Sequence, residues 1–140
     1  MAQFILLHNY NDNTPLVINM YDINMIYLDS YDNHSNNKFT HIELNDMDEV
    51  ICVKETPDKI YNTLNTNDDI NKARYGPEFF KAKFIKLHEI DTNDVIILNK
   101  FNITLIDKED NETKIYYKCD RYNTFCVNET VEKIFKVLND

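Results

Sequence analysis

The chain has 140 residues, of which 43% are hydrophobic, and it carries a formal net charge of −9. Such an acidic surface repels nucleic acid phosphates and anionic membranes, which disfavours nucleic acid as a partner. No apolar run reaches the roughly 20 residues of a membrane span, and the three cysteines lack disulfide or redox spacing, so we expect a cytoplasmic protein without membrane contact.

The chain repeats its opening sequence after 80 positions. Phe4 to His8 read FILLH, and Phe84 to His88 read FIKLH. The identities continue at the same offset and then, after a deletion of about six residues, at an offset of 74. They include Asn13 and Asn93, Asn19 and Asn99, Ile23 and Ile103, Cys52 and Cys126, Glu55 and Glu129, and Thr56 and Thr130. We interpret the chain as two homologous modules, residues 1–65 and 82–140, joined by residues 66–81.

Each module has roughly 60 residues, which is near the lower size limit for an independent core. Repeated units of this size usually bury their apolar surface against one another. We therefore expect the modules to pack together or against other chains. The charge is unevenly shared, because residues 1–65 carry three lysines and ten acidic residues, a net charge of −7.

The opening strand of each module has two distinct faces. In the second module Lys86 separates Ile85 from Leu87, and this alternation predicts that the two aliphatic residues face the core. The corresponding residues of the first module, Ile5 and Leu7, are expected to do the same. The outward residues of that strand are then Phe4, Leu6 and His8. This surface is more apolar than a solvated strand needs, so we expect a contact there that Leu6→Lys would break.

The remaining strands are predicted at corresponding places in the two modules. A turn rich in Asn and Asp, residues 9–14, leads into the apolar triplet Leu16 to Ile18, and Ile96 to Leu98 is its counterpart. Unbroken triplets of this kind are typical of strands covered on both faces. Further strands are predicted near residues 23–28, 39–44 and 50–54, and near 103–106, 114–118 and 124–128. The loop after Ser30 is expected to be longer than the loop after Asp110.

A helix is predicted to close each module. Thr56 and Thr130 are suitable N-caps, and Pro57 fits the first helical position. Ile60 and Leu64 are four residues apart and share a helix face, as do their counterparts in the second module. The predicted fold class is α+β: two homologous small modules, each a bent antiparallel β-sheet of about five strands followed by a C-terminal α-helix.

The connector, residues 66–81, is expected to be ordered. Its polar start favours a short helix that Gly76 and Pro77 would end. It also carries more aromatic residues than a solvated tether needs. We expect these residues, Tyr75, Phe79 and Phe80, to dock at the seam between the modules.

Residues with catalytic or ligand-binding potential do not form a recognised pattern. Cys52 and Cys126 are expected to be buried strand thiols, and His8 and His88 to be surface residues at strand ends. Acidic runs such as residues 46–49 and 107–110 lack the glycine and terminal glutamate of a calcium-binding EF-hand loop. Gly76 is the only glycine, which excludes glycine-rich phosphate loops. The sequence predicts no catalytic residues, no cofactor and no metal site.

The segment Val53 to Ile60, VKETPDKI, and its counterpart Val127 to Ile134, VNETVEKI, carry a family resemblance. Together with the Phe-Ile-x-Leu-His opening and Ile18-Asn19, they resemble the small FlbD-like flagellar and swarming proteins and related short open reading frames of phages and Bacteroidetes. The resemblance implies small interaction modules without an assigned catalytic site. The tandem arrangement and the Asn and Asp in the first turn favour a phage or phage-like setting, in the host cytoplasm or the virion.

Taken together, the sequence predicts a non-catalytic binding or assembly protein that acts through protein–protein contacts or self-association. The candidate interaction residues are Phe4, Leu6, His8, Tyr75, Phe79 and Phe80. One alternative is a viral counter-defence protein that sequesters a host protein or a small nucleotide signal. Another is an enzyme with an unrecognised site.

Overall fold

The computed structural model describes residues 4–29, 37–45, 47–64, 84–118 and 123–139. These residues form ten strands in three sheets, together with two α-helices, so the fold is α+β as predicted. The strands are β1 (Phe4–His8), β2 (Pro15–Asn19), β3 (Ile23–Asp29), β4 (Phe39–Leu44), β5 (Ile51–Val53), β6 (Phe84–His88), β7 (Val95–Asn99), β8 (Ile103–Glu109), β9 (Glu112–Tyr117) and β10 (Thr124–Val127). The helices cover residues 57–64 and α2 (Val131–Leu138), and the 3-10 turns are η1 (Met20–Asp22) and η2 (Lys100–Asn102).

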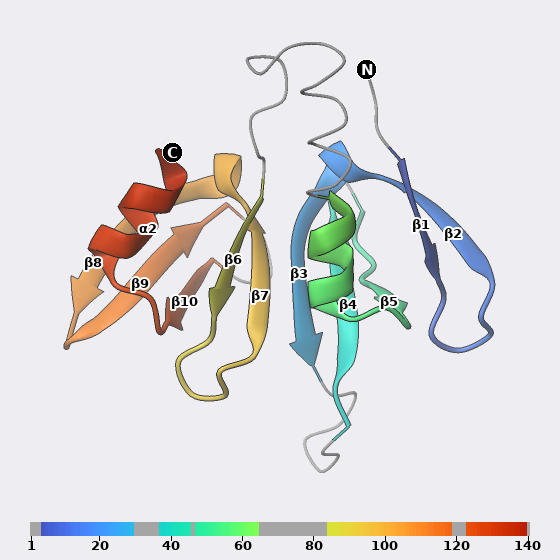
Figure 1. The fold of residues 1–140 in the computed structure, drawn as a ribbon, viewed down its shortest axis with the longest axis horizontal. Coiled ribbons are helices and arrows are strands. Elements are labelled where there is room, and N and C mark those ends of the chain that lie inside the picture. Colours follow the sequence, from blue (N-terminus) through green and yellow to red (C-terminus); the bar gives the residue numbers. More distant parts are fainter. Residues whose placement is uncertain (1–3, 30–36, 46, 65–83, 119–122, 140) are drawn as a thin grey trace.

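The largest sheet joins strands from distant parts of the sequence. Its order is β5-β4-β3-β7-β6, and its two parts meet where β3 pairs antiparallel with β7. In that pair Met25 lies opposite Leu98, and Ile26 lies opposite Ile97. The other sheets are the hairpin β1-β2 and the meander β10-β9-β8. From the β1-β2 hairpin to β8, the strands follow one another along the long axis of the molecule (Figure 1).

The sheet arrangement differs from the prediction of one five-stranded sheet in each module. The hairpin β1-β2 meets β5 only through the bridge between Asn9 and Val53, and the hairpin β6-β7 meets β10 only through the bridge between Glu89 and Val127. The hairpin β6-β7 instead continues the sheet of β3, β4 and β5. Sequence periodicity assigns strands but does not choose their partners.

Many local contacts recur in the N-terminal half (residues 4–64) and the C-terminal half (residues 84–139). Asn13 and Asn93 hold the first turn of each half with positive φ angles of 63° and 60°. Asn residues tolerate this left-handed conformation better than most residues. Thr56 and Thr130 accept hydrogen bonds from backbone N–H groups three residues on, each at 3.2 Å, which confirms the predicted N-caps.

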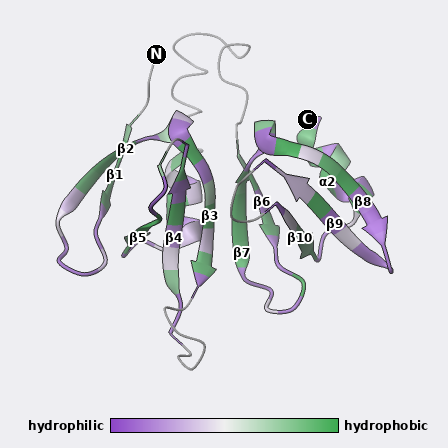
Figure 2. Cartoon of the chain, turned by 180° about the vertical axis from the view of Figure 1, so that it is seen from behind, coloured by the Kyte–Doolittle hydropathy of each residue, from purple (hydrophilic) through white to green (hydrophobic). Residues whose placement is uncertain are grey.

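The two halves share their hydrophobic cores across the seam between β3 and β7. The N-terminal core is built around Ile26 and Ile60, and it also contains Phe84 and Ile97 from the C-terminal half. In return, Met25 and Tyr27 of β3 belong to the C-terminal core. Seen from behind, β3 and β7 run side by side in the middle of the molecule (Figure 2).

The apolar triplets have different environments in the two halves. Ile96, Ile97 and Leu98 are all buried, as the pattern predicted for a strand covered on both faces. The prediction is wrong for β2, where Ile18 is buried but Val17 is exposed. The physical reason is that Ile97 packs in the N-terminal core while Ile96 and Leu98 pack on the other face, in the C-terminal core. Only one face of β2, the one with Ile18, packs in a core formed by the described residues.

The connections after β3 and β8 also differ. The strand bounds leave nine residues between β3 and β4 but only Asp110 and Asn111 between β8 and β9, which confirms the predicted difference in length. Both turn residues have positive φ, as a tight two-residue hairpin requires. None of the described helices is long and apolar enough to cross a membrane.

Candidate functional site

The outer face of the β1-β2 hairpin is an exposed apolar surface. Phe4, Leu6 and Val17 are 58%, 59% and 68% exposed, and Leu6 lies directly opposite Val17 in the strand pair. Ile5 and Leu7 are buried, so the predicted orientation of β1 is confirmed. We name Phe4, Leu6 and Val17 the β2-end surface. Its role as a contact stays a prediction at this point.

The corresponding residues of the C-terminal half are not exposed in the same way. Phe84 and Ile97, the counterparts of Phe4 and Val17, are 7% and 0% exposed. Lys86, the counterpart of Leu6, lies over the ring of Tyr61. The face that is exposed on β1-β2 is therefore buried on β6-β7, where it packs against residues of the N-terminal half.

A second group of exposed apolar side chains lies at the other end of the fold. Phe101 of η2, Leu105 of β8 and Phe135 of α2 are 63%, 52% and 68% exposed. We name these three residues the β8-end surface. It was missed from the sequence. The counterparts of these residues are less exposed, because Met25 is buried and Tyr21 and Tyr61 are half-buried.

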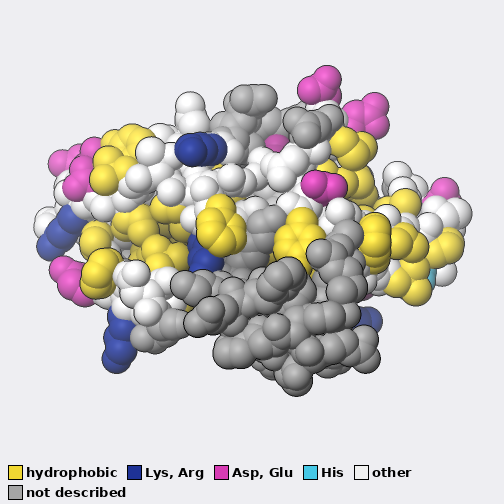
Figure 3. Space-filling model, turned by 90° about the horizontal axis from the view of Figure 1, so that it is seen from above, with side chains coloured by type: hydrophobic (Ala, Val, Ile, Leu, Met, Phe, Trp, Pro, Cys, Tyr) yellow, Lys and Arg dark blue, Asp and Glu magenta, His cyan; other side chains and the backbone are white. Residues whose placement is uncertain are grey.

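The two apolar surfaces are far apart. The hairpin β1-β2 lies at one end of the long axis, and β8 with α2 lies at the other (Figure 1). Viewed from above, hydrophobic side chains gather at the surface toward both ends (Figure 3). This placement allows the two ends to contact different molecules at the same time.

A groove of about 450 Å³ opens beside α2 at the β8 end, lined among others by Ile106, Val131 and Glu132. Ile106 is half-buried there, whereas its counterpart Ile26 is completely buried by the packing of β7. The groove therefore lies where the C-terminal half lacks the cover that β7 gives to the N-terminal half.

His8 and His88 each hold a glutamate of the same half. His8 donates its backbone N–H to Glu55 at 2.9 Å, and its Nδ1 lies 2.8 Å from the same carboxylate. Glu129 receives the same two contacts from His88, at 3.0 and 2.7 Å. These contacts tie the end of the first strand to the start of the helix, so His8 has a structural partner within the chain.

The electrostatics of Glu55 reflect that role. Burial of its carboxyl opposes ionisation, but the hydrogen bonds from the His8 side chain and backbone outweigh this effect and lower the pKa of Glu55 below its ordinary value. Sequence reasoning missed this contact. Its signal was the recurrence of histidine and glutamate at the offsets of the sequence repeat, His8 with His88 and Glu55 with Glu129.

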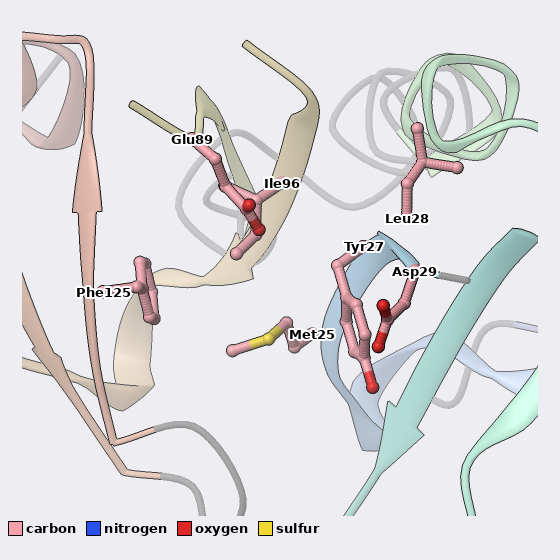
Figure 4. Close-up of a pocket in the computed structure, with 7 residues that line it drawn as sticks. All are labelled: Met25, Tyr27, Leu28, Asp29, Glu89, Ile96 and Phe125. Carbon is pink, nitrogen blue, oxygen red and sulfur yellow. The ribbon is translucent and has the colours of Figure 1, made fainter. Parts of the chain in front are cut away.

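The seam between the halves contains a pocket of about 180 Å³ (Figure 4). Burial of the Glu89 carboxyl, and then the charge of Asp94, raise the pKa of Glu89. Asp29 also lines the pocket, beside the apolar side chains of Met25, Ile96 and Phe125. Ligand pockets usually enclose about 300–1,000 Å³. A small acidic pocket of this kind does not suit a nucleotide, so it gives no support to nucleotide sequestration.

The cysteines do not form a reactive site in the described residues. Cys52 and Cys126 are free thiols on β5 and β10, and both are half-buried, which corrects the expectation of full burial. Burial, followed by the hydrogen bond to Glu112, raises the pKa of Cys126, which disfavours its reactive thiolate. Within the described ranges, no group of three or more His, Cys, Asp or Glu residues is placed to hold a metal ion.

Tyr75, Phe79 and Phe80 of the predicted site lie outside the described residues, as does the short helix predicted in the connector. No protein-family model, curated protein or solved structure matches the chain. The two end surfaces are therefore the candidate site on geometric grounds alone.

Proposed function

We propose that the protein is a non-catalytic binding or assembly component that acts through protein–protein contact at the β2-end surface. The observation that carries the proposal is the contrast between Val17, which is 68% exposed, and its counterpart Ile97, which is completely buried. Clustered apolar residues of this kind at a protein surface are typical of contact sites. The acidic N-terminal half would surround the contact with carboxylates, as in the polar rim of ordinary interfaces.

We further propose that the two halves are duplicated copies of one module, related to the FlbD-like proteins and their phage-encoded relatives, and that the protein acts in the cytoplasm. The support is the agreement of sequence offset and contact. Lys54 N–H donates to His8 O and Asn128 N–H donates to His88 O, each pair displaced by the offsets of the sequence repeat. The Asn19 and Asn99 side chains cap their 3-10 turns in the same way.

The test compares Val17→Lys with a matched control, Met47→Lys. Met47 is also exposed and apolar, but it lies in the β4–β5 connection. Light scattering after size exclusion would report self-association, and pull-down from a host lysate would report other partners. We expect Val17→Lys to lose the contact and Met47→Lys to keep it. Unchanged mass and unchanged partners in Val17→Lys would contradict the proposal.

A further inference from the structure

The seam inside the chain is a template for the two exposed ends. There, the outer edge of β7 pairs with the outer edge of β3, with Ile97 opposite Ile26 and Leu98 opposite Met25. The counterpart of β7 is β2, and the counterpart of β3 is β8. Among the described strands, β2 has only β1 as a partner and β8 has only β9. Within the described part of the chain, one edge of each kind is thus left without a strand partner.

The exposed apolar residues are those that the template would cover. Met25 is buried in the seam, and its counterpart Leu105 is 52% exposed. Ile97 is buried in the seam, and its counterpart Val17 is exposed. Phe84 is buried in the N-terminal core, whereas Phe4 is exposed. Both components of the seam therefore recur, uncovered, at opposite ends of the molecule.

We propose that the β2-end surface binds the β8-end surface of a second copy of this chain, so that copies associate head to tail. This inference rests on the proposed function and names its partner. In the register of the internal seam, β2 would pair antiparallel with β8 of the next copy, with Val17 opposite Ile106 and Ile18 opposite Leu105. Val17 would cover Ile106 beside the groove along α2, as Ile97 covers Ile26.

The side chains that differ from the template remain compatible with it. Internally, Lys86 packs over Tyr61; between copies, Leu6 would meet Phe135, so an apolar pair replaces a cation–π pair. Leu6 and Phe135 are both exposed within one chain. Asn99 donates its side-chain N–H to Ile23 O at 3.3 Å, and Asn19 can make the same contact to Ile103 of the next copy.

Two differences limit the strength of the contact between copies. Asp107 is the counterpart of Tyr27, so a charged residue begins the second half of β8. This charge would confine the pairing with β2 to the residues before Asp107. The internal pairing of β3 with β7 is equally short, with two residue pairs. At the internal seam the Tyr117 hydroxyl bonds to the Asn24 carbonyl. In the strand pairing Tyr117 lies opposite Ile103 as Leu44 lies opposite Ile23, so Leu44 takes its place in the N-terminal half and has no hydroxyl. We therefore expect a reversible association.

Head-to-tail contact is heterologous, so every open assembly has one unpaired β2 edge and one unpaired β8 edge at its ends. Such contacts close into rings or extend as filaments, according to the rotation between successive copies. A contact between two identical β2 edges would instead stop at the dimer. Head-to-tail association requires the edge of β8, whereas a contact between two β2 edges does not involve β8.

The experiment uses two variants of the full chain, Val17→Lys on β2 and Leu105→Lys on β8. Both residues are exposed, so the folded chain can accept lysine at either position. We expect wild type to associate as concentration rises, and each variant alone to weaken self-association by more than about tenfold. An equimolar mixture should restore association but stop at a dimer, because one intact β2 edge then meets one intact β8 edge. The double variant Val17→Lys with Leu105→Lys should not associate with either single variant, because it has neither an intact β2 edge nor an intact β8 edge.

Phe135→Lys serves as a second β8-end variant, and circular dichroism melts establish that each variant is folded. Wild type with the mass of one chain at every concentration would overturn the head-to-tail inference. The inference would also be overturned if Leu105→Lys and Phe135→Lys each associate normally while Val17→Lys does not. A mixture of Val17→Lys and Leu105→Lys that forms no dimer would overturn it as well. If wild type is monomeric but captures a host protein that only Val17→Lys loses, the inference fails and the proposed function stands.

Discussion

Lys86 Nζ lies 3.0 Å from the Asp58 carboxylate, so β6 of the C-terminal half is tied to the helix over residues 57–64 of the N-terminal half. The same ammonium lies 5.3 Å from the centre of the Tyr61 ring. Lys86 and Asp58 are both partly exposed, so the ion pair itself adds little stability. Its significance is that the internal seam accepts a lysine at the position that corresponds to Leu6.

This relationship revises the expectation that Leu6→Lys breaks the contact. In head-to-tail association, residue 6 faces Glu132 and Phe135 of the next copy, which correspond to Asp58 and Tyr61. Leu6→Lys should therefore keep association within about threefold of wild type, whereas Leu6→Asp should weaken it more than about tenfold through repulsion by Glu132. Light scattering over a concentration series measures both.

Glu132→Lys provides the reciprocal control for that prediction. It should restore the association of Leu6→Asp when both substitutions are present in one chain, because every contact then pairs a carboxylate at position 6 with an ammonium at position 132. Equal loss in Leu6→Lys and Leu6→Asp, or no restoration by Glu132→Lys, would show that residue 6 does not face α2 of another copy.

A second prediction compares the stability effects of truncating Ile97, which is buried, and its counterpart Val17, which is exposed. Ile97→Ala should lower the free energy of unfolding by about 2–5 kcal/mol, because it leaves a cavity in the seam. Val17→Ala should change it by no more than about 0.5 kcal/mol, because Val17 is exposed within the chain. Chemical denaturation at concentrations below the onset of association measures both. Similar losses for the two variants would contradict the difference in burial.

The sequence predicted the local features of this fold because those features depend on local patterns. The alternation around Lys86 established that Leu6 faces outward, and Thr56 and Thr130 identified the helix starts. The pairing of β3 with β7 could not be predicted in this way. Leu16 to Ile18 and Ile96 to Leu98 are both unbroken aliphatic triplets, and only the position of each strand in the fold decides which one is covered.

The candidate site was predicted only in part, for the same reason. Phe4 and Leu6 were identified because their own strand is too apolar for a solvated face. Leu105 and Phe135 were not, because they look like ordinary core residues until the structure shows that no described strand covers them. Both Val17 and its counterpart Ile97 were predicted to lie in strands buried on both faces, and the prediction is correct for Ile97 only.

A third prediction follows from the lowered pKa of Glu55. Because the folded-state pKa lies below the unfolded value of about 4.5, ionised Glu55 contributes stability above that pH and loses it as the pH falls through the folded-state pKa. Glu55→Gln should cost about 1–3 kcal/mol at neutral pH, since the amide has one acceptor oxygen and no charge, so one of the two hydrogen bonds from His8 is lost. The difference from wild type should shrink as the pH falls below about 4.5.

Glu49→Gln is the control for that experiment, because Glu49 is an exposed residue in the β4–β5 connection. It should leave the free energy of unfolding unchanged across the same pH range. Thermal or chemical denaturation from neutral to acid pH measures both variants. A Glu55→Gln effect that stays constant down to strongly acid pH would contradict the role of the ionised carboxylate.

A fourth prediction concerns Glu89, whose pKa shifts in the opposite direction. Burial and the charges of Asp94, Asp29 and Asp91 raise it, and Lys38 opposes them only in part. Ionisation of Glu89 therefore destabilises the folded state at neutral pH. Glu89→Gln should raise the melting temperature at pH 7, and this gain should vanish as the pH falls below about 4.5, where both states are protonated. Asp91→Asn, at an exposed turn, should give a smaller gain.

The last prediction is that neither half folds stably alone. Phe84 and Ile97 complete the N-terminal core, and Met25 and Tyr27 complete the C-terminal core, so separation removes core residues from both. Fragments 1–66 and 82–140 should each lack a cooperative melt, and mixing them should restore one. Circular dichroism melts of the fragments, the mixture and the whole chain measure this. Fragments that melt cooperatively at about the temperature of the whole chain would show that the shared cores contribute little to stability.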